Sequence, residues 1–417
     1  MPQERITLLE NKRIVLAVTG SIAVYKAVDL ASKLTQAGAL VDTIMTPAAQ
    51  KFVTPLTFQS VTGRPVYTDL WKSDTSGSMH THIAHIGLGE GSDLILIAPT
   101  TAHTIAKLAM GLADDLLTVT VLAARCPVLI APTMDGGMYT NPATQENLAT
   151  LRRRGIKIIE PEEGRFASGL AGKGRLPDTP TLLGAIRYTV SRTGRLRGRK
   201  VVVTSGGTRE PLDPVRFITN RSSGKQGHAL AQAALDAGAD VTLITAARGL
   251  PAPFGAQEIP VESAEEMCAA VLEHSQQADA LLMAAAVADF RPQHVADQKI
   301  KKKDEGEEGL RLELVRNPDI LLEVKAQRDQ SGLPRVVVGF AAESEHLLEN
   351  AASKLRRKGL DLLIANDISA ADAGFDVDTN RAIILDKGGG HEMLSLASKA
   401  IISEGIIVRV GDLLFRR

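Results

Sequence analysis

The residues most able to do chemistry in this 417-residue chain follow short apolar runs that are typical of buried strands. Gly20 and Ser21 follow RIVLAVT, where backbone N–H groups and a hydroxyl at a helix start suit a phosphate. The stretch is not G-x-G-x-x-G, so it gives little support to a dinucleotide, and a plain strand-to-helix turn explains it equally well. Thr101, in APTTAHT after DLILIAP, would reach the same crevice if both strands belong to one open parallel sheet.

Three histidines, His80, His82 and His85, stand shortly before the DLILIAP run. No Asp, Glu or further His lies at a ligand-like spacing from them, which disfavours a metal site. They could be surface residues, or one of them could act as a general base, since imidazole titrates nearest to neutral pH. The pattern alone does not choose among the three.

A lone acid, Asp135, follows the apolar run CPVLI in the stretch APTMDGGMY. A loop carboxylate is the default interpretation of such a residue. If the preceding strand ends in a ligand crevice, however, the same position would place Asp135 against a substrate.

The stretch TSGGTREPLDPVRFITNRSSGKQG, residues 204–227, is the richest in the chain. Gly206 and Gly207 end a strand-like run and suit close approach of the backbone to an anion. The later NRSSG leads into a helix pattern that Ser222, Ser223 and Gly224 could cap. A long surface loop with a capped helix is the alternative, but Arg216 and Asn220 between these elements favour phosphate binding.

A second acid, Asp289, ends the strand-like stretch AAAVADF. An acid at that place in an α/β fold is a natural partner for a ribose or a metal-bound phosphate. Lys299, ten positions on in QKIKKK, could reach the same phosphates or be one more solvated lysine. Most lysines of the charged segment QKIKKKDEGEEGLRLE are expected to lie in a solvated hairpin or a mobile loop.

The order of elements predicts two domains. RIVLAVTG, the helix pattern AVYKAVDLASKLTQAGA and LVDTIMT recur in plan as KVVVTSGG, GKQGHALAQAALDAGA and DVTLIT. Continuous apolar strands of this kind are typical of a parallel sheet that is covered on both faces. We therefore predict an α/β protein with two doubly wound, Rossmann-like parallel-sheet domains, residues 1–190 and 199–417, joined by a basic linker at 191–198.

The composition excludes several other classes. Lys and Arg together number 48, as do Asp and Glu, so no general attraction to nucleic acid or an anionic membrane is expected. The apolar runs are far shorter than a bilayer span, and the charged MPQERITLLENKR is no signal-peptide core. Cys126 and Cys268 are distant and outside any C-x-x-C motif, which disfavours disulfides and structural zinc. A cytoplasmic protein is predicted.

The motifs of the first half resemble those of flavin-dependent cysteine decarboxylases, specifically phosphopantothenoylcysteine decarboxylase. The resemblance covers most of residues 12–180 and rests on GSIAVYKA, TPLTFQSVTGRPVY, HIGLGEGSDLILIAPTTAHTIAKLAMGLADDLLT, APTMDGGMYTNPATQENL and GLAGKGRLPD. It implies a flavodoxin-like domain with FMN in the strand-end crevice, oxidising the cysteine-derived thiol so that CO2 can leave before the enethiol is reduced. It also implies that His85 is the active-site histidine and that the flavin contacts lie at Gly20, Ser21, Thr46 and Thr101.

Two positions depart from that family's motifs. Its PxMNxxM has asparagine where this chain has Asp135, and its ACG, whose cysteine protonates the reduced intermediate, reads ASG with Ser168. An ionised carboxylate only accepts hydrogen bonds, and a hydroxyl is a far weaker acid than a thiol. Because Met134, Met138 and the following GKGR are intact, we expect a working variant in which Asp135 is protonated when buried beside substrate.

The motifs of the second half resemble phosphopantothenate–cysteine ligase over about residues 199–410. They are GGTREPLDPVRFITNRSSGKQG, AAAVADF, KIKKK, RNPDI, VGFAAE and LxxKGLDLLIAND. The resemblance implies that CTP and Mg²⁺ activate the carboxylate of phosphopantothenate as an acyl-CMP, which the amine of cysteine attacks. It implies that Arg216 and Asn220 handle the acyl intermediate and that Lys299 is the essential lysine. The implied nucleotide contacts are Met283, Ala284, Ala285, Asp289, Lys299, Asn317, Pro318, Asp319, Ile320, Phe340, Lys354 and Lys358.

Together the two resemblances imply a bifunctional enzyme of coenzyme A synthesis that makes and then decarboxylates phosphopantothenoylcysteine. One alternative is an active ligase whose flavin domain is impaired by Asp135 and Ser168 and serves only for assembly. Another is a flavin carrier or sensor, against which the intact Asn220 and Lys299 argue. The implied assembly is a homo-oligomer in which flavin-domain trimers and ligase-domain dimers build a dodecamer, with small-molecule substrates and no nucleic-acid or membrane partner.

Overall fold

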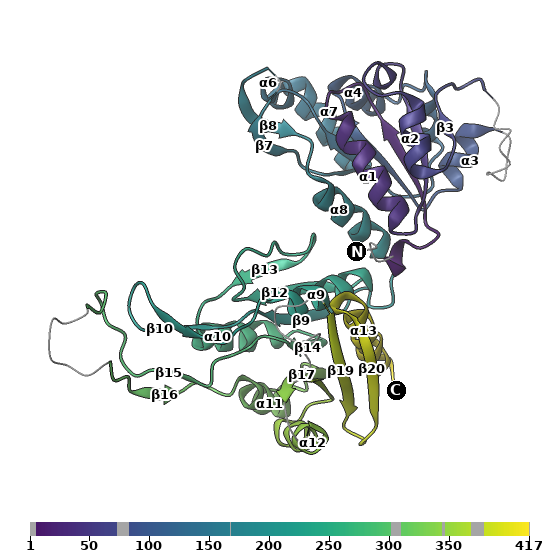
Figure 1. The fold of residues 1–417 in the computed structure, drawn as a ribbon. Coiled ribbons are helices and arrows are strands. Elements are labelled where there is room, and N and C mark those ends of the chain that lie inside the picture. Colours follow the sequence, from purple (N-terminus) through teal and green to yellow (C-terminus); the bar gives the residue numbers. More distant parts are fainter. Residues whose placement is uncertain are drawn as a thin grey trace. The chain divides into compact units, whose positions relative to one another are not determined.

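The chain forms two compact units, Met1–Val190 and Ser191–Arg417 (Figure 1). The structure is a computed structural model that describes residues 6–72, 83–166, 168–301, 310–343, 347–367 and 379–416. Each unit has its own sheet and its own buried core. The predicted fold class, two doubly wound α/β domains, is confirmed.

A parallel six-stranded sheet, in the order β3-β2-β1-β4-β5-β6, forms the centre of the first unit. Without the two-residue edge strand β3, this is the flavodoxin order, and the chain reverses its direction of winding between β1 and β4. Loops after these two strands therefore diverge and leave a crevice at the carboxyl edge of the sheet. The strands are β1 (Arg13–Val18), β2 (Leu40–Met45), β3 (Val66–Tyr67), β4 (Leu94–Thr100), β5 (Val128–Pro132) and β6 (Lys157–Ile158).

Both faces of this sheet are covered, which explains why its strands are apolar without alternation. Alternate residues of β1 enter two separate cores, with Leu16 in one and Val15 and Ala17 in the other. The first core contains α1, whose buried side chains recur at helical spacing, and Gly38 beyond its end adopts a positive φ of 97° as AGA predicts. The helices are α1 (Val24–Gln36), α2 (Pro55–Thr62), α3 (Ala84–Glu90), α4 (Ala102–Met110), α5 (Leu116–Leu122), α6 (Gly136–Thr140), α7 (Pro142–Arg153) and α8 (Thr179–Ser191).

An eight-stranded sheet, in the order β13-β12-β9-β14-β17-β18-β19-β20, forms the centre of the second unit. It is parallel from β13 to β18, but β19 and β20 are antiparallel, so the purely parallel sheet that the sequence predicts is extended by a hairpin. The strands are β9 (Lys200–Ser205), β12 (Asp240–Thr245), β13 (Gln257–Pro260), β14 (Ala280–Met283), β17 (Val336–Glu343), β18 (Leu362–Asp367), β19 (Thr379–Asp386) and β20 (His391–Ser398).

The helices of the second unit include a long C-terminal one, α13, which lies beside β19 and β20 and packs on α9 (Figure 1). The predicted helix GKQGHALAQAALDAGA is α9, and Gly238 after it has a positive φ of 95°. The helices are α9 (Lys225–Asp236), α10 (Ala264–Ser275), α11 (Ile320–Ser331), α12 (Leu347–Lys358) and α13 (Lys399–Phe415).

Three small two-stranded sheets stand apart from the two main ones. They are β7 (Glu162–Arg165) with β8 (Ala171–Arg175), β10 (Arg209–Pro211) with β11 (Phe217–Thr219), and β15 (Phe290–Pro292) with β16 (Leu314–Arg316). Much of the charged segment 298–313, between β15 and β16, lies outside the described residues. The first of these sheets carries residues of the candidate site in the first unit, and candidate residues of the second unit lie directly beside the strands of the other two.

The basic residues around 191–199 belong to the second unit and pair with its acidic residues. Arg192 pairs with Asp240 at 2.9 Å, and Arg199 pairs with Asp279 at 2.9 Å. Arg195 pairs with Asp412 of α13 at 2.8 Å. The positive charge that distinguishes this stretch in the sequence is thus neutralised within the second unit.

A buried carboxylate ties β2 to its surroundings in the first unit. Asp42 has a side chain that is 1% exposed, and it accepts hydrogen bonds from Arg64 Nε at 2.8 Å and Nη2 at 3.1 Å. Arg13 of β1 donates a further bond at 3.2 Å. Removing one partner of such a buried group leaves the other charges uncompensated.

We expect Asp42→Asn to lower the free energy of unfolding of the first unit by about 3 kcal/mol, because both guanidinium groups lose their counter-charge. Urea denaturation followed by circular dichroism measures this. The matched control is Glu146→Gln, which neutralises an exposed acid on α7 of the same unit. Equal midpoints for the two variants would contradict the role of Asp42.

Candidate functional sites

A pocket of about 500 Å³ opens at the carboxyl edge of the first sheet. It brings together Gly20, Ser21, Thr101, Asp135 and Ser168, five of the residues that the sequence singles out. It is also lined by Ile22, Ala23, Tyr25, Lys26, Ala102, Thr133, Met134, Met138, Arg165, Phe166, Gly174, Arg175 and Leu176. The position agrees with the rule that ligands bind where winding reverses in a doubly wound sheet.

Thr19 fastens the two strand ends that frame the pocket. Its Oγ1 donates to the carbonyl of Pro99 at 2.7 Å and accepts the N–H of Thr101 at 3.1 Å. Beside it, a Cβ added to Gly20 would stand 2.5 Å from the Cβ of Ala48, so a larger residue would push the turn away from the loop after β2. The turn that begins at Gly20 therefore has a fixed place at the start of the segment leading into α1.

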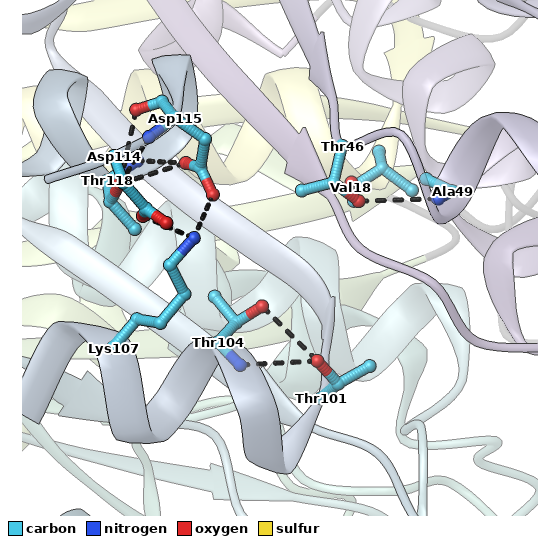
Figure 2. Close-up of polar contacts among 9 residues, drawn as sticks. All are labelled: Val18, Thr46, Ala49, Thr101, Thr104, Lys107, Asp114, Asp115 and Thr118. Carbon is cyan, nitrogen blue, oxygen red and sulfur yellow. Dashed lines mark hydrogen bonds and ion pairs between the residues drawn. The ribbon is translucent and has the colours of Figure 1, made fainter. Parts of the chain in front are cut away.

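The hydroxyls of Thr46 and Thr101 hold backbone turns at this edge of the sheet (Figure 2). Thr46 Oγ1 accepts from the N–H of Ala49 at 3.3 Å, and Thr101 Oγ1 caps α4 by accepting from Thr104 at 3.3 Å. Thr101 lines the pocket, whereas Thr46 is not among its lining residues. Thr46 therefore shapes the loop after β2 rather than the pocket wall in this conformation.

The other end of α4 is fastened by a charged cluster (Figure 2). Lys107 is largely buried, and its Nζ lies 2.5 Å from a carboxylate oxygen of Asp114 and 2.5 Å from one of Asp115. Burial disfavours the ammonium, but the two carboxylates outweigh it and raise the pKa of Lys107. Asp115 also caps α5 through Thr118. These bonds hold α4, and with it Thr101, against the loop that follows.

The pocket suits a ligand with a flat apolar part and an anionic end. Its walls include the apolar side chains of Ile22, Tyr25 and Met138, and its size is ordinary for a cofactor site. Gly20 and Ser21 lie where N–H groups can meet an anion at the start of the segment leading into α1. A flavin nucleotide has both of these features.

His85 is not among the residues that line this pocket. It is the second residue of α3 and is half-buried. His80 and His82, the other two candidates, lie outside the described residues. His85 as a general base stays a prediction.

The two residues that depart from the family motifs contact each other. Ser168 Oγ donates to Asp135 Oδ2 at 2.7 Å, and the other oxygen of Asp135 accepts from the N–H of Gly137 at 3.2 Å. Asp135 thereby caps the short helix α6, while Ser168 lies in the turn between β7 and β8. These residues are 33 positions apart in sequence, and no pattern in the sequence indicated that they meet.

Gly174 allows the β7–β8 hairpin to approach Asp135. A Cβ on this residue would lie 2.2 Å from the carbonyl oxygen of Met134, and the N–H of Met134 donates to the Gly174 carbonyl at 3.0 Å. Any side chain here would separate the two segments. Gly174, the second glycine of GKGR, is therefore required by the packing of the hairpin against Met134.

A second group, Glu160, fastens the same hairpin from outside the pocket. Its carboxylate accepts from Tyr139 at 2.9 Å, Lys173 at 2.9 Å and Arg152 at 2.7 Å, which join α6, β8 and α7. Burial raises the pKa of Tyr139 to about 12, and its bond to Glu160 acts in the same direction. For Glu160, burial is outweighed by these three donors, and its pKa is lowered. Glu160 thus holds together α6, which Asp135 caps, and the β7–β8 hairpin, which carries Ser168.

Sequence reasoning missed three cationic side chains of this pocket, Lys26, Arg165 and Arg175. The arginines flank the FASG turn on β7 and β8, and Lys26 lies on α1. Their positions beside the predicted motifs were the available signal.

In the second unit, glycines bring the end of β9 close to its neighbours. A Cβ on Gly206, whose φ is 83°, would lie 2.3 Å from the N of Ala247, and one on Gly207 would lie 2.7 Å from the carbonyl of Asn220. Of the three residues that the sequence offers as caps of α9, Ser222, Ser223 and Gly224, the structure places Gly224 at the N-cap. Its φ of 78° is a left-handed conformation that glycine adopts without strain, and it has no side chain to supply a capping hydrogen bond.

Two asparagines bracket the segment between β14 and β15. Asn220 Nδ2 donates to the carbonyl of Val287 at 3.1 Å, and Asn317 Nδ2 donates to that of Ala288 at 2.8 Å. The N–H of Asn317 also donates to the carbonyl of Asp289 at 2.9 Å. Asp289 itself is exposed. The structure thus brings Asn220, Asp289 and Asn317 to one place.

The remaining nucleotide candidates come from several elements of the second unit. Met283 and Ile320 are buried, so their backbone rather than their side chains is available to a ligand. Lys358 of α12 pairs with Asp319 at 3.0 Å, and Lys354 lies one helical turn earlier. Phe340 is half-buried in β17, directly after the residue that pairs with Met283. Ala284, Ala285 and Pro318 are half-buried in the adjoining loops.

Asp213 organises the loop that carries Arg216. Its side chain is 0% exposed, and it accepts from the N–H groups of Val215 at 2.8 Å, Arg216 at 2.9 Å and Ile300 at 3.0 Å. Arg216 adds an ion pair at 2.9 Å and donates to the carbonyl of Ile300. Ile300 follows Lys299 in the chain, so the carboxylate that binds Arg216 also holds the backbone beside Lys299.

The surroundings of Asp213 stabilise its ionised form. Burial disfavours the charge, but the N–H groups of Ile300, Val215 and Arg216 and the guanidinium of Arg216 outweigh it and hold the pKa at about 2. Among the described residues, no cluster of three or more His, Cys, Asp or Glu side chains could hold a metal ion. Nor, within those same ranges, is any helix long and apolar enough to cross a membrane.

Comparison with known proteins assigns both halves of the chain. Residues 3–191 match the family model described as Flavoprotein, and residues 196–413 match that of the DNA/pantothenate metabolism flavoprotein C-terminal domain. The chain is 45% identical over 409 residues to the coenzyme A biosynthesis bifunctional protein CoaBC of Bacillus subtilis (strain 168), covering 97% of this chain and 98% of that protein. The CoaBC protein of Mycobacterium tuberculosis (strain ATCC 25618 / H37Rv) is 45% identical to the chain over 407 residues. That alignment covers 95% of each protein. A crystal structure of the C-terminal domain of a CoaBC protein is 34% identical with a TM-score of 0.45, covering 53% of this chain and 98% of that one.

We expect Asp213→Asn to destabilise the second unit at neutral pH. All partners of Asp213 are hydrogen-bond donors, and an amide has only one oxygen that can accept from them, whereas a carboxylate has two. The folded-state pKa of about 2 lies below the ordinary value of 3.8, so the native contribution is present above pH 4 and is lost as pH falls toward 2. Urea midpoints of wild type and variant should therefore differ at pH 7 and converge between pH 4 and pH 2. The control is Asp297→Asn, an exposed acid of the same segment, and an equal effect there would contradict the prediction.

Proposed function

Because the chain belongs to the family of bifunctional coenzyme A biosynthesis proteins, with a flavoprotein decarboxylase half and a ligase half, we propose two specific reactions. The second unit joins cysteine to phosphopantothenate at the expense of CTP, through an acyl-CMP intermediate. The first unit then decarboxylates phosphopantothenoylcysteine to phosphopantetheine with bound FMN. The supporting observation is that curated bifunctional relatives align over 97% of the chain, through both candidate sites.

In the first unit, we assign the binding of FMN and the transfer of protons to different residues. FMN, when bound, supplies the electron acceptor and donor for the thiol carbon on either side of CO2 loss. Gly20, Ser21 and Thr101 hold its anionic and polar edges, with Thr46 shaping the adjoining loop. His85 is the proposed base for the substrate thiol, for which an imidazole is well suited near neutral pH.

The Asp135–Ser168 pair takes the place of the family's amide and thiol. In the present conformation Asp135 only accepts, from Ser168 and from Gly137. We propose that substrate excludes water from the pocket and that Asp135 then carries a proton, which it shares with Ser168 across their hydrogen bond. This pair would stabilise and quench the enethiolate that remains after CO2 leaves. The contact supports a compensated site rather than a decayed one, because two unrelated losses would not be expected to meet.

In the second unit, the proposed task is to bring two anions together. Arg216 and Lys299 offset the charge of the phosphopantothenate carboxylate and the nucleotide phosphates, and Asn220 fixes the loop against which the acyl group is held. The glycines after β9 and the start of α9 offer N–H groups to phosphate. The candidate residues from Met283 to Ala285, Asp289, Asn317 to Ile320, Phe340, Lys354 and Lys358 bind CTP, and Mg²⁺ accompanies its phosphates.

A homo-oligomer, up to the dodecamer that the resemblance implies, is part of the proposal. Several large apolar side chains of the first unit are exposed, among them Tyr25 at 62%, Leu56 at 67% and Phe52 at 49%. Tyr25 lies on α1 and Leu56 on α2, and these two helices pack on each other. Exposed apolar side chains on neighbouring helices favour contact with a further copy of the chain.

We expect the FMN-loaded protein, given phosphopantothenate, cysteine, CTP and Mg²⁺, to accumulate phosphopantetheine and release pyrophosphate and CO2. Lys299→Gln should stop pyrophosphate release, while decarboxylation of added phosphopantothenoylcysteine continues. Mass spectrometry of the products distinguishes the outcomes. Accumulation of phosphopantothenoylcysteine by wild type would mean that only the ligase works, and turnover with ATP in place of CTP would contradict the proposed nucleotide.

We expect decarboxylation by wild type to fall as pH rises and Asp135 loses its proton, whereas Asp135→Asn, which has no proton to lose, should show no such limb. Ser168→Ala keeps the carboxylate and should keep a pH-dependent limb at a lower rate. Single-turnover CO2 release between pH 5 and pH 9 measures both, with flavin content as the control. An Asp135→Asn profile that matches wild type would refute the proton-sharing pair.

A further inference from the structure

Two arginines on the β7–β8 hairpin, Arg165 and Arg175, line the pocket of the first unit. They come from the two ends of the paired strands, since Arg165 pairs with Ala171 and Arg175 with Glu162. Gly164 leaves room for the side chain of Arg175 to cross β7, because a Cβ there would lie 2.5 Å from its Nη1. Both guanidiniums thus belong to one wall, on the same hairpin as Ser168.

The guanidinium groups of these arginines differ from the other nearby cations in having no partner among the described residues. Lys173 of the same hairpin pairs with Glu160, and Lys26 donates to the carbonyl of Leu176 at 2.8 Å. Within the described part of the chain, the side chains of Arg165 and Arg175 make no ion pair and no hydrogen bond. A guanidinium has five donors in a fixed fork that suits phosphate, so an unpartnered pair at a pocket wall points to an anionic ligand.

The charges of the pocket indicate which anionic group of a ligand the two arginines bind. Its lining carries Lys26, Arg165 and Arg175 against the single acid Asp135. The turn at Gly20 and Ser21 already offers a phosphate site for the flavin, on the strand side of the pocket. A cation beside the reacting carboxylate would oppose its loss, because it stabilises the ground state. The arginines therefore suit an anionic group of the substrate that is remote from the carboxylate.

We propose that Arg165 and Arg175 form a subsite for the phosphate monoester of the substrate. The inference rests on the proposed decarboxylation of phosphopantothenoylcysteine and adds to it the groups that select the phosphorylated molecule. Each arginine can make charge-assisted, bidentate bonds to the phosphate. Binding energy from this remote group then holds the reacting end in place.

The test uses two ligands that differ only in the phosphate, phosphopantetheine and pantetheine, titrated into the FMN-loaded full chain by calorimetry. Wild type should bind the phosphorylated ligand at least tenfold more tightly. Arg165→Gln and Arg175→Gln should each reduce that preference roughly tenfold, a loss typical of one charged hydrogen bond, and the double variant should abolish it. Affinity for pantetheine and flavin content should not change.

The matched control is Arg125→Gln, which removes an exposed arginine of the same unit outside the pocket and should keep the full preference. If phosphopantetheine also binds through its phosphate to the second unit, that binding would persist in every variant. The proposal is therefore tested by the part of the phosphate preference that the substitutions remove. The proposal is overturned if wild type shows no preference, if the variants weaken both ligands equally, or if they lose FMN instead. A phosphate preference that depends on both arginines, without CO2 release by wild type, would uphold the subsite and reject the proposed decarboxylation.

Discussion

The burial of both faces of a parallel sheet is the constraint on which each unit depends. Helices must cover both faces, so the parallel strands are joined by crossovers and end at the same edge. In the first unit this places the loops after β1, β4 and β5 around one pocket. In the second it places the glycine turn after β9 beside the loops after β14. The apolar strands thus determine where chemistry can occur before any polar residue is considered.

Once the edge is defined, individual carboxylates fix its loops. Asp213 collects N–H donors from two distant segments and so aligns Arg216 with the residue next to Lys299. Glu160 does the same for α6, α7 and the β7–β8 hairpin. In both cases an ionised acceptor with two oxygens satisfies several donors at once, which an amide could not do. Loops that would otherwise be mobile acquire a defined geometry.

The contact between Asp135 and Ser168 changes how the departures from the family motifs are understood. Considered separately, each replacement removes a function. Asp135 lacks the hydrogen-bond donor of the family's asparagine, and Ser168 lacks the acidic proton of the family's cysteine. Because they share a hydrogen bond of 2.7 Å, they form a single polar unit that faces the pocket. Gly174 makes that contact possible by admitting the hairpin to the carbonyl of Met134. The same hairpin presents Arg165 and Arg175, so proton transfer and phosphate recognition share one support.

The amino-acid sequence by itself determined the two α/β units, their apolar strands and the turns that would meet a ligand. These features are local, because periodicity and glycine placement act over a few residues, and α1, α9 and their closing glycines appear as predicted. Tertiary structure alone decided the rest. It paired Asp135 with Ser168, selected Gly224 from the three predicted capping residues as the N-cap of α9, and added the antiparallel strands β19 and β20. It also brought Arg165 and Arg175 into the pocket, because contacts between distant segments depend on packing that no local pattern encodes.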